Sequence, residues 1–292
     1  MDAILITGPT ASGKSALAVE LAQKHGGEVV NADSMQLYDT LHVLTARPFE
    51  ADMGGIPHHL YGTVPALQKY STGEWLRTAE GITADIRARG KIPVFVGGTG
   101  LYFKALAGGL SAMPAIADDI RNRWRERLKA EGPEALHAEL QKRDFRAAAT
   151  LNPGDRQRIV RALEVVEASG QSILDFQERS GAAVIDESRA EKIIVLPDRK
   201  ILHERINRRF ATMLDLGAIR EVEALLALNL NPEMPVMKAI GVPQIAALLR
   251  GELTLEQVIS QASAATRQYA KRQMTWFRNQ MDESWERLNA IT

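Results

Sequence analysis

The chain has 292 residues, with 36 Lys and Arg against 36 Asp and Glu, and it has no cysteine, which excludes a disulfide framework, a thiolate zinc site and a cysteine nucleophile and favours a reducing cytoplasm. The balanced charge argues against a protein that coats nucleic acid through a strongly basic surface, so any RNA contact must come from local clusters. We expect neither a membrane span nor a signal peptide, because no run of about 18 apolar residues occurs and a strand-like run begins at Ala3.

The first third of the chain alternates strand-like and helix-like segments. Short apolar, β-branched runs predict strands, whereas apolar stripes with a helical repeat predict helices, one of them opened by a capping box. The predicted elements are a strand at 3–7, a helix at 16–24, a strand at 29–30, a helix between Ser71 and Gly90, and a strand at 92–96. Strands separated by helices indicate a parallel sheet.

The middle of the chain has a different character, because strand signals vanish between about residues 111 and 181 and charged helices follow one another. The remaining predicted elements are helices at 118–131, ending at Gly132-Pro133, and at 155–168, a strand at 193–196, and helices at 201–216 and from about 255 to 279. We therefore predict a core domain of residues 1–115 and 183–292, interrupted by an all-helical insertion domain of residues 116–182.

Residues 8–15 match the phosphate-loop pattern G-x-x-x-x-G-K-[ST] in full, as Gly8-Pro9-Thr10-Ala11-Ser12-Gly13-Lys14-Ser15. Backbone N–H groups of such a loop turn toward a phosphate, Lys14 adds a full charge, and the Ser15 hydroxyl can ligate Mg²⁺. The alternative, a chance glycine-rich turn, conflicts with the predicted strand before the loop and the predicted helix after it. The pattern predicts a P-loop NTPase-like α/β fold, but the phosphates could belong to a nucleoside triphosphate or to another diphosphate.

Two further polar residues follow predicted strands. Asp33 comes just after the strand at 29–30, and Thr99 lies in a glycine-rich turn after the strand at 92–96. Ligands of open parallel sheets bind outside the carboxyl ends of the strands, so both residues should lie beside the phosphate loop. A turn or capping role for Asp33, and a plain tight turn around Thr99, are equally good interpretations of the spacing alone.

Several segments together resemble the tRNA dimethylallyltransferases, also called tRNA isopentenyltransferases, from about residue 3 to residue 279. The segments are the phosphate loop, Asn31 to Tyr38, Thr45-Ala46-Arg47-Pro48, Pro57-His58-His59-Leu60, Val96 to Tyr102, Leu151 to Glu164, and Thr266-Arg267-Gln268-Tyr269-Ala270-Lys271-Arg272-Gln273. Phosphate loops occur in many families, whereas the blocks that begin at Asp33 and at Thr266 are far more specific.

The resemblance implies transfer of a dimethylallyl group from dimethylallyl diphosphate to N6 of the adenosine 3′ of the tRNA anticodon, position 37, with release of diphosphate. An adenine amino group is a poor nucleophile, so a positioned base helps, and Asp33 takes this role by resemblance. Lys14, Thr99 and Arg209 are the other catalytic residues that it implies, with Mg²⁺ as cofactor. The diphosphate would be bound by the residues Gly8, Thr10, Ala11, Ser12, Gly13, Lys14 and Ser15.

Basic clusters supply candidate tRNA contacts on helices of the predicted insertion and near the carboxyl terminus. The implied tRNA-binding residues are Asp33, Ser34, Met35, Gln36, Thr99, Arg121, Gln157, Arg158, Ile159, Val160, Arg161, Arg267, Lys271 and Arg272. The alternative for any single arginine is a solvated helix face. Either Arg205 or Arg209, which lie four residues apart, resembles the arginine that faces the diphosphate in this family; Arg209 is the better match.

Three details stand apart from the main pattern. The adjacent pair His58-His59 could suggest zinc, but no further ligand stands at a suitable spacing, which favours a structural role. The basic helix near the carboxyl terminus could lie on a membrane, although an RNA groove explains it better. Val242-Pro243 stands where many family members have an aromatic and a basic residue, which puts a local tRNA or core contact in doubt.

Two other classes of function are compatible with parts of the sequence. A nucleotide or small-metabolite kinase would use the same loop to bind ATP, with the helical insertion as a lid. A non-catalytic RNA-binding module would leave the intact phosphate loop unexplained. The enzyme interpretation predicts tRNA and dimethylallyl diphosphate as partners, no membrane, and a monomer.

Overall fold

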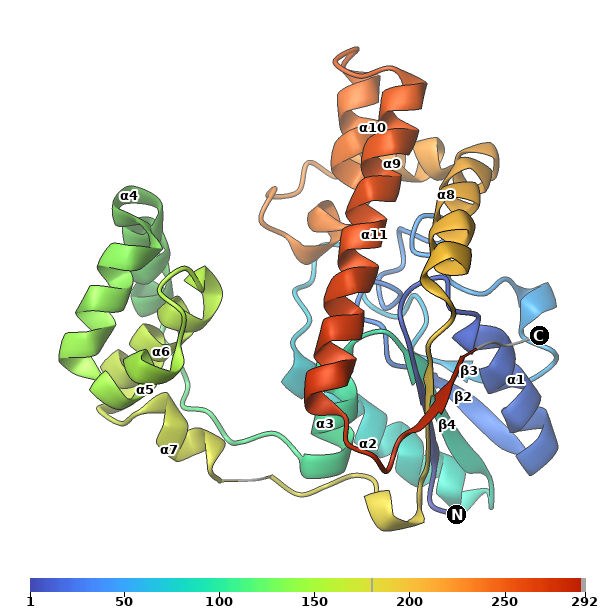
Figure 1. The fold of residues 1–292 in the computed structure, drawn as a ribbon, viewed down its shortest axis with the longest axis horizontal. Coiled ribbons are helices and arrows are strands. Elements are labelled where there is room, and N and C mark those ends of the chain that lie inside the picture. The colour runs from blue at the N-terminus through green and yellow to red at the C-terminus, as the bar shows by residue number, and fades with distance from the viewer. Residues whose placement is uncertain (180, 290–292) are drawn as a thin grey trace. The chain divides into compact units, whose positions relative to one another are not determined.

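The computed structural model describes residues 1–179 and 181–289, which form two compact units. Unit 1 comprises Met1–Ala107 and the chain from Val184 onward, and unit 2 comprises Gly108–Ala183. Unit 2 begins earlier than residue 116, where the predicted insertion begins, because Met113 and Ile116 already pack on the hydrophobic core of unit 2. Figure 1 shows the helices of unit 2 in green and yellow.

Unit 1 is built on a parallel six-stranded sheet with the strand order β3-β2-β4-β1-β5-β6. The strands are β1 (Ile4–Thr7), β2 (Gly27–Asn31), β3 (His58–His59), β4 (Ile92–Gly97), β5 (Glu191–Val195) and β6 (Glu286–Leu288). The predictions of β1, β2, β4 and β5 are confirmed, whereas β3 and β6 are too short to leave a periodic signal. Because Thr7 pairs with Gly97 and Asn31 with Val96, the strands β1, β2 and β4 end at one edge of the sheet.

Helices and short 3₁₀ segments connect these strands (Figure 1). The helices of unit 1 are α1 (Lys14–His25), α2 (Thr72–Ala88), α3 (Gly100–Gly108), α8 (Arg199–Asp215), α9 (Ala218–Ala227), α10 (Val242–Leu249) and α11 (Leu255–Gln280), and its 3₁₀ segments are η1 (Glu50–Asp52), η2 (Glu187–Arg189) and η3 (Pro235–Lys238). The predicted capping box of α2 is confirmed, since Ser71 and Glu74 bond each other's backbone N–H groups. Unit 1 is therefore an α/β protein of the P-loop type.

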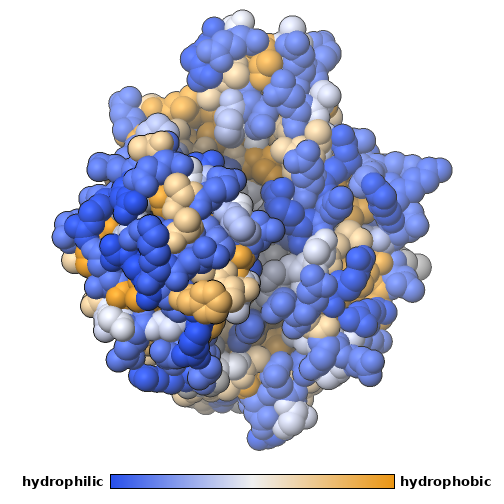
Figure 2. Space-filling model, turned by 60° about the vertical axis from the view of Figure 1, so that its left-hand side comes forward, coloured by the Kyte–Doolittle hydropathy of each residue, from blue (hydrophilic) through white to orange (hydrophobic). Residues whose placement is uncertain are grey.

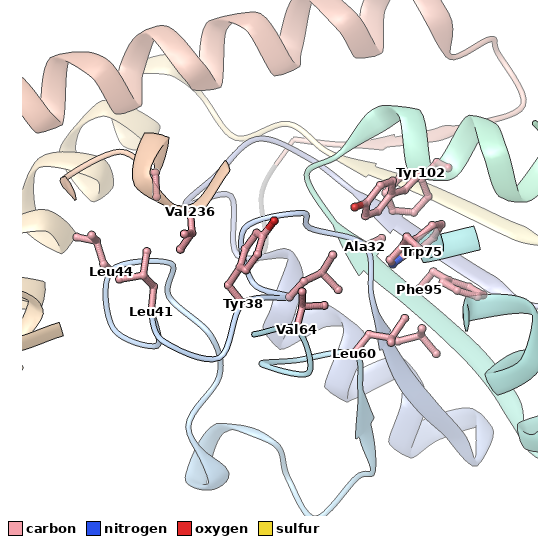
Figure 3. Packing of buried hydrophobic residues seen from close by; sticks show 14 of the residues in the cluster. Ala32, Tyr38, Leu41, Leu44, Leu60, Val64, Trp75, Phe95, Tyr102 and Val236 are labelled. Atoms are coloured by element: carbon pink, nitrogen blue, oxygen red, sulfur yellow. The ribbon is translucent and has the colours of Figure 1, made fainter. Parts of the chain in front are cut away.

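A buried aromatic group supports the edge where β2 and β4 end. The rings of Trp75 and Tyr102 stack with centroids 4.0 Å apart, and Phe95 meets Trp75 edge to face. Figure 3 shows these rings beside Ala32, the residue that follows β2. The indole Nε1–H of Trp75 donates to the carbonyl of Asn31 at 3.0 Å, and this bond fixes the end of β2. Apolar packing thus places the residues that come after this strand.

Unit 2 has a hydrophobic core of its own, which contains the fully buried residues Trp124, Leu140 and Leu163. Its helices are α4 (Asp118–Arg143), α5 (Phe145–Thr150), α6 (Arg156–Ser169) and α7 (Ile173–Gln177). The predicted end of a helix at Gly132-Pro133 is a kink in the structure. Gly132 leaves the helical conformation with φ 81°, and the chain resumes a helix at once because a proline in the first turn needs no N–H partner.

The surface is mostly hydrophilic on the face drawn in Figure 2, where apolar side chains lie in small groups among charged and polar ones. Within residues 1–179 and 181–289, no helix combines the length and the apolar character that crossing a membrane requires.

Candidate active site at the carboxyl edge of the sheet

The phosphate loop follows β1 directly and leads into α1. A Cβ on Gly8 would lie 2.5 Å from the carbonyl oxygen of Val195, so only glycine allows this approach to β5. Gly13 and Ala11 have positive φ angles of 95° and 63°. Such angles bend the loop into a concave shape in which successive backbone N–H groups can point toward a bound anion. The Ser12 hydroxyl is buried and has no hydrogen-bond partner in the described chain, so it is free to donate to an anion in the loop.

Three charged side chains meet at this loop. Lys14 is held by a hydrogen bond from its Nζ to the carbonyl of Pro9 at 3.3 Å. Burial lowers the pKa of Lys14 to about 8; nearby Asp33 opposes this shift and Arg209 adds to it. Burial also lowers the pKa of Arg209, again opposed by Asp33. The site therefore concentrates positive charge that Asp33 only partly balances, as a site for a diphosphate requires.

The two arginines of α8 that the sequence left as alternatives lie in different places. Arg205 donates from Nη1 to the carbonyl of Ser12 at 3.4 Å and so supports the back of the phosphate loop. Arg209, one turn later, lines both cavities described below. Of the two, Arg209 is the residue whose side chain faces a space that a ligand can occupy.

Asp33 closes a tight turn and also lines a cavity. Its backbone N–H and carbonyl bond the side chain of Asn31 at 2.8 and 3.0 Å, and its Oδ1 accepts from the N–H of Met35 at 3.0 Å. These bonds make a tight turn that holds the carboxylate at the sheet edge. Asp33 nevertheless lines a cavity, and its Oδ2 lies on the side of Gly98, 3.4 Å from where a Cβ on that residue would be.

Thr99 joins the ends of β2 and β4. Its Oγ1 accepts from the backbone N–H of Ser34 at 3.0 Å and donates to the Ser34 hydroxyl at 3.4 Å, while its own N–H donates to the carbonyl of Ala32 at 3.2 Å. The predicted meeting of Asp33 and Thr99 at one edge is confirmed as geometry. Their catalytic roles belong to the proposal below.

Gln273 of α11 is a site residue that the sequence analysis did not single out. Its Oε1 accepts from the N–H of Thr10 at 3.0 Å, and its Nε2 donates to the carbonyl of Gly98 at 2.9 Å. The glycines after β4 make room for this helix, because a Cβ on Gly98 would lie 2.2 Å from Gln273 Nε2 and one on Gly100 would lie 2.2 Å from the ring of Trp276. The only sequence signal was the specific block that ends in Gln273.

A second residue that the sequence analysis missed, Glu221 of α9, holds a loop of the site. Its carboxylate accepts three successive backbone N–H groups, from His42 at 3.0 Å, Val43 at 2.7 Å and Leu44 at 3.0 Å. Gln36, predicted to contact tRNA, donates from Nε2 to the carbonyls of residues 45 and 46 in the same loop, each at 3.0 Å. No sequence pattern links Glu221 to this loop.

Two cavities open beside the loop and share Arg209 and Met213. The first, of about 370 Å³, has a mostly apolar lining; among its lining residues are Ser15, Val19, Val43, Phe49, Tyr61 and Val96. The second, of about 450 Å³, is lined by residues that include Thr10, Ala11, Asp33, Thr45, Tyr269 and Arg272. An apolar group and a polar base could therefore approach the phosphate loop from its two sides.

In unit 2, the predicted tRNA contacts differ in exposure. Arg121, Arg158 and Arg161 form ion pairs with acidic neighbours on their own helices at 3.3, 3.6 and 3.4 Å, and the Arg158 side chain is 74% exposed. Ile159 and Val160 are 0% and 7% exposed and belong to the core of unit 2, because they lie on the inner face of α6. Their side chains are unavailable to RNA, unlike that of exposed Gln157.

The predicted contacts on α11 are divided between roles. Arg272 lines the second cavity and packs over the ring of Tyr269 at 5.7 Å. Arg267 donates to the side chain of Asn207 on α8 at 2.6 Å, and Lys271 is exposed. The helix also buries Ala270 and Phe277 in unit 1, so its apolar face packs on protein.

The remaining sequence details have structural explanations. His58 and His59 form β3, and His59 Nε2 bonds the Glu28 carboxylate at 2.7 Å. Among residues 1–179 and 181–289, no three His, Cys, Asp or Glu side chains come together as metal ligands would. Val242 and Pro243 form the first turn of α10. Val242 is buried, so the apolar residue at this position packs in the hydrophobic core.

The chain has a parallel sheet whose strand β1 leads into a phosphate loop, and a carboxylate and an apolar cavity lie beside this loop. These features place it in the class of P-loop α/β proteins. A family model described as IPP transferase matches residues 36–280, and one described as Isopentenyl transferase matches residues 1–61. The chain is 64% identical over 288 residues to a tRNA dimethylallyltransferase of Rhizobium meliloti, covering 99% of this chain and 95% of the relative. A tRNA dimethylallyltransferase of Agrobacterium fabrum is 64% identical over 287 residues, covering 98% and 96%.

Solved structures give the same result. The full-length tRNA isopentenylpyrophosphate transferase of Bacillus halodurans has a TM-score of 0.71 at 32% identity, covering 99% of this chain and 90% of that one. A eukaryotic dimethylallyltransferase acting on tRNA has a TM-score of 0.78 at 28% identity, covering 94% and 69%. The chain belongs to the tRNA dimethylallyltransferase family, a class of prenyltransferase enzymes.

Proposed function

We propose that this protein transfers a dimethylallyl group from dimethylallyl diphosphate to N6 of the adenosine 3′ of the anticodon, position 37, in tRNA. The names of its close relatives support the reaction class. The observation that carries the proposal for this chain is the second cavity, which is lined both by Asp33 and by Thr10 and Ala11 of the phosphate loop. A base and a leaving-group site that line one cavity match a displacement in which one bond forms as the other breaks.

The acceptor side depends on Asp33. The N6 lone pair of adenine is delocalised into the ring, and attack on the allylic carbon becomes easier as a proton leaves the nitrogen. Oδ1 of Asp33 is engaged by Met35, so Oδ2 is the oxygen that accepts this proton. N6 is hidden by stacking in the anticodon loop, so the adenosine must be extruded into the second cavity, where Ser34 and Met35 line the wall.

The donor side depends on the phosphate loop. As the carbon–oxygen bond breaks, negative charge builds on the diphosphate, and preorganised donors stabilise it. The backbone N–H groups at the start of α1, the Ser12 hydroxyl, Lys14 and Arg209 supply these donors. Thr99 holds Ser34 in place at the boundary between donor and acceptor. The five-carbon chain fits the apolar cavity beside Ser15.

The donor set also fits Mg²⁺ carried in by the diphosphate. Mg²⁺ commonly takes one or two protein oxygens together with phosphate oxygens and water, and the exposed Ser15 hydroxyl at the first turn of α1 is such an oxygen. Bound there, Mg²⁺ would supply further charge neutralisation for the leaving group. Ser15 is the residue that would hold it.

The same geometry makes a decisive assay possible. The protein should be incubated with labelled dimethylallyl diphosphate, Mg²⁺ and unmodified tRNA, and the tRNA nucleosides should then be analysed. We expect label on the N6 position of one adenosine per tRNA. Control reactions should contain ATP and a small acceptor in place of the prenyl donor, because the kinase alternative predicts phosphoryl transfer from ATP to that acceptor. Unlabelled tRNA together with phosphoryl transfer would reject the proposal.

A further inference from the structure

We propose that Gln273 is a positioning residue that sets the distance between the diphosphate loop and the acceptor base; this inference rests on the proposed function. Its side chain is 6% exposed, and its amide bonds both sides of the site, the N–H of Thr10 at 3.0 Å and the carbonyl of Gly98 at 2.9 Å. With both ends of the amide used inside the protein, Gln273 is not free to read RNA.

On the donor side, Gln273 holds a strained part of the loop. Ala11 has φ 63°, a left-handed conformation that is unfavourable for a residue with a Cβ. Such a conformation persists only where its surroundings enforce it. The hydrogen bond from Thr10 N–H to Gln273 holds the Pro9–Thr10 peptide unit, and the bond from Arg205 to the Ser12 carbonyl holds the Ser12–Gly13 unit. The residues on both sides of Ala11 are therefore fixed.

On the acceptor side, Gln273 orients the peptide that leads into Thr99. The Gly98 carbonyl accepts from Gln273, while the N–H and hydroxyl of Thr99 bond Ala32 and Ser34 on either side of Asp33. One amide therefore connects the loop that receives the leaving group with the turn that holds the base. Small errors in such a distance are costly, since a misplacement of about 1 Å can reduce rates about a hundredfold.

Two substitutions test this role. Gln273→Met keeps the length of the side chain and removes both hydrogen bonds, and Gln261→Met makes the same change at an exposed position of α11 as the control. Gln273→Glu keeps an acceptor for Thr10 but, as a carboxylate, cannot donate to Gly98. A protonated glutamic acid regains one donor and one acceptor, so acid should restore the pair of bonds.

We expect Gln273→Met to lower kcat for prenyl transfer about tenfold to a hundredfold and to weaken pyrophosphate binding, with KM for tRNA within about twofold of the control. The kcat of Gln273→Glu relative to the unsubstituted protein should rise severalfold as the pH falls from about 8 to about 5.5, because the carboxyl regains its proton. Melting temperatures show whether each variant is folded. If Gln273→Met does not fold, the acid recovery of Gln273→Glu decides.

A kcat and a pyrophosphate affinity equal to those of Gln261→Met would overturn the inference. So would a loss confined to KM for tRNA, which would make Gln273 an RNA contact, or a pH-independent defect of Gln273→Glu. Pyrophosphate binding does not require prenyl transfer, so a failure of this inference can be told from a failure of the proposed function, in which the unsubstituted protein and the control would both leave tRNA unmodified.

Discussion

At the scale of single residues, Asp33 combines a hydrogen bond that closes a turn with the role of base in the proposed reaction. Oδ1 closes the turn after β2 by accepting from the N–H of Met35, and the Asp33 side chain lines the second cavity. An asparagine can keep the first bond through its amide oxygen, but it cannot accept a proton. Asp33→Asn thus tests the base without removing the turn.

We expect Asp33→Asn to reduce single-turnover prenyl transfer about 10²- to 10⁴-fold. Pyrophosphate affinity should stay equal or increase, because a negative charge near Lys14 and Arg209 is lost. Rapid-quench kinetics and isothermal titration with pyrophosphate provide the two measurements. If affinity and rate fell together by the same factor, Asp33 would be a structural residue of the loop.

The lowered pKa of Lys14 leads us to expect that diphosphate binding depends on pH. Burial lowers the pKa of Lys14 to about 8 in the free protein, and a bound diphosphate must raise it again by adding negative charge. Above this pH the free protein has lost the proton that the complex needs, so affinity falls as pH rises and binding takes up a proton. Titration calorimetry in buffers of different ionisation enthalpy measures that uptake.

Lys14→Arg is the matched control for this effect, because a guanidinium stays charged in the same pH range. Its affinity for pyrophosphate should be lower in absolute terms, since the side chain is larger, but the extra loss above about pH 8 should disappear. Any titration of pyrophosphate itself is common to both proteins. An identical pH profile for the two would assign the dependence to the ligand.

At the scale of elements, Glu28 ties β2 to its neighbours at the edge opposite the site. Its 8% exposed side chain bonds Arg89, which caps α2, at 2.7 Å and His59 of β3 at 2.7 Å. Burial alone would raise the pKa of Glu28, but the hydrogen bonds from Arg89 and His59 outweigh it and lower the pKa. The ionised carboxylate therefore stabilises the fold.

The substitution Glu28→Gln should lower the free energy of unfolding by about 1–2 kcal/mol at neutral pH. This value is near the low end for hydrogen bonds to a charged group, because the Arg89 side chain is 42% exposed and solvent screens its charge. A lowered pKa means that this stabilisation is present above the unfolded-state pKa and is lost as pH falls through the folded-state value. Urea unfolding near pH 7 and near pH 3 should therefore show the difference shrinking in acid. A difference of constant size would exclude the ionic contribution.

At the scale of the whole molecule, the chain forms two compact units, each with its own hydrophobic core. Unit 1 contains the phosphate loop, Asp33 and both cavities, and unit 2 carries exposed arginines such as Arg158. Exposed ion pairs contribute little to stability, so the pair between Arg158 and Asp155 can be exchanged for an RNA phosphate at small cost. Such an exposed arginine suits the contact with the phosphate backbone of tRNA that we propose for unit 2.

Arg158→Gln should weaken tRNA binding and reduce the slope of log affinity against log salt by about one unit, the effect of one lost phosphate contact. Arg146→Gln is the control, because Arg146 lies in the same unit, is 60% exposed and pairs with Asp175 at 2.8 Å. Fluorescence titrations at several salt concentrations give both slopes. An unchanged slope for Arg158→Gln would leave this arginine on a solvated face.

The sequence by itself determined the parts of this protein that depend on near neighbours in the chain. Strand runs such as 92–96, the capping box at Ser71 and the phosphate loop are local patterns, because each element's geometry repeats within a few residues. The order of strand and loop even predicted that Asp33 and Thr99 would meet, since parallel strands end at one edge.

Only the tertiary structure decided which distant groups complete the site. Gln273 reaches Thr10 across 263 residues and Gly98 across 175, and Glu221 reaches the loop at 42–44 across 177 to 179. Helix propensity and periodicity state which face of a helix is apolar, but the partner of a polar side chain is chosen where elements pack, and no local pattern encodes that contact.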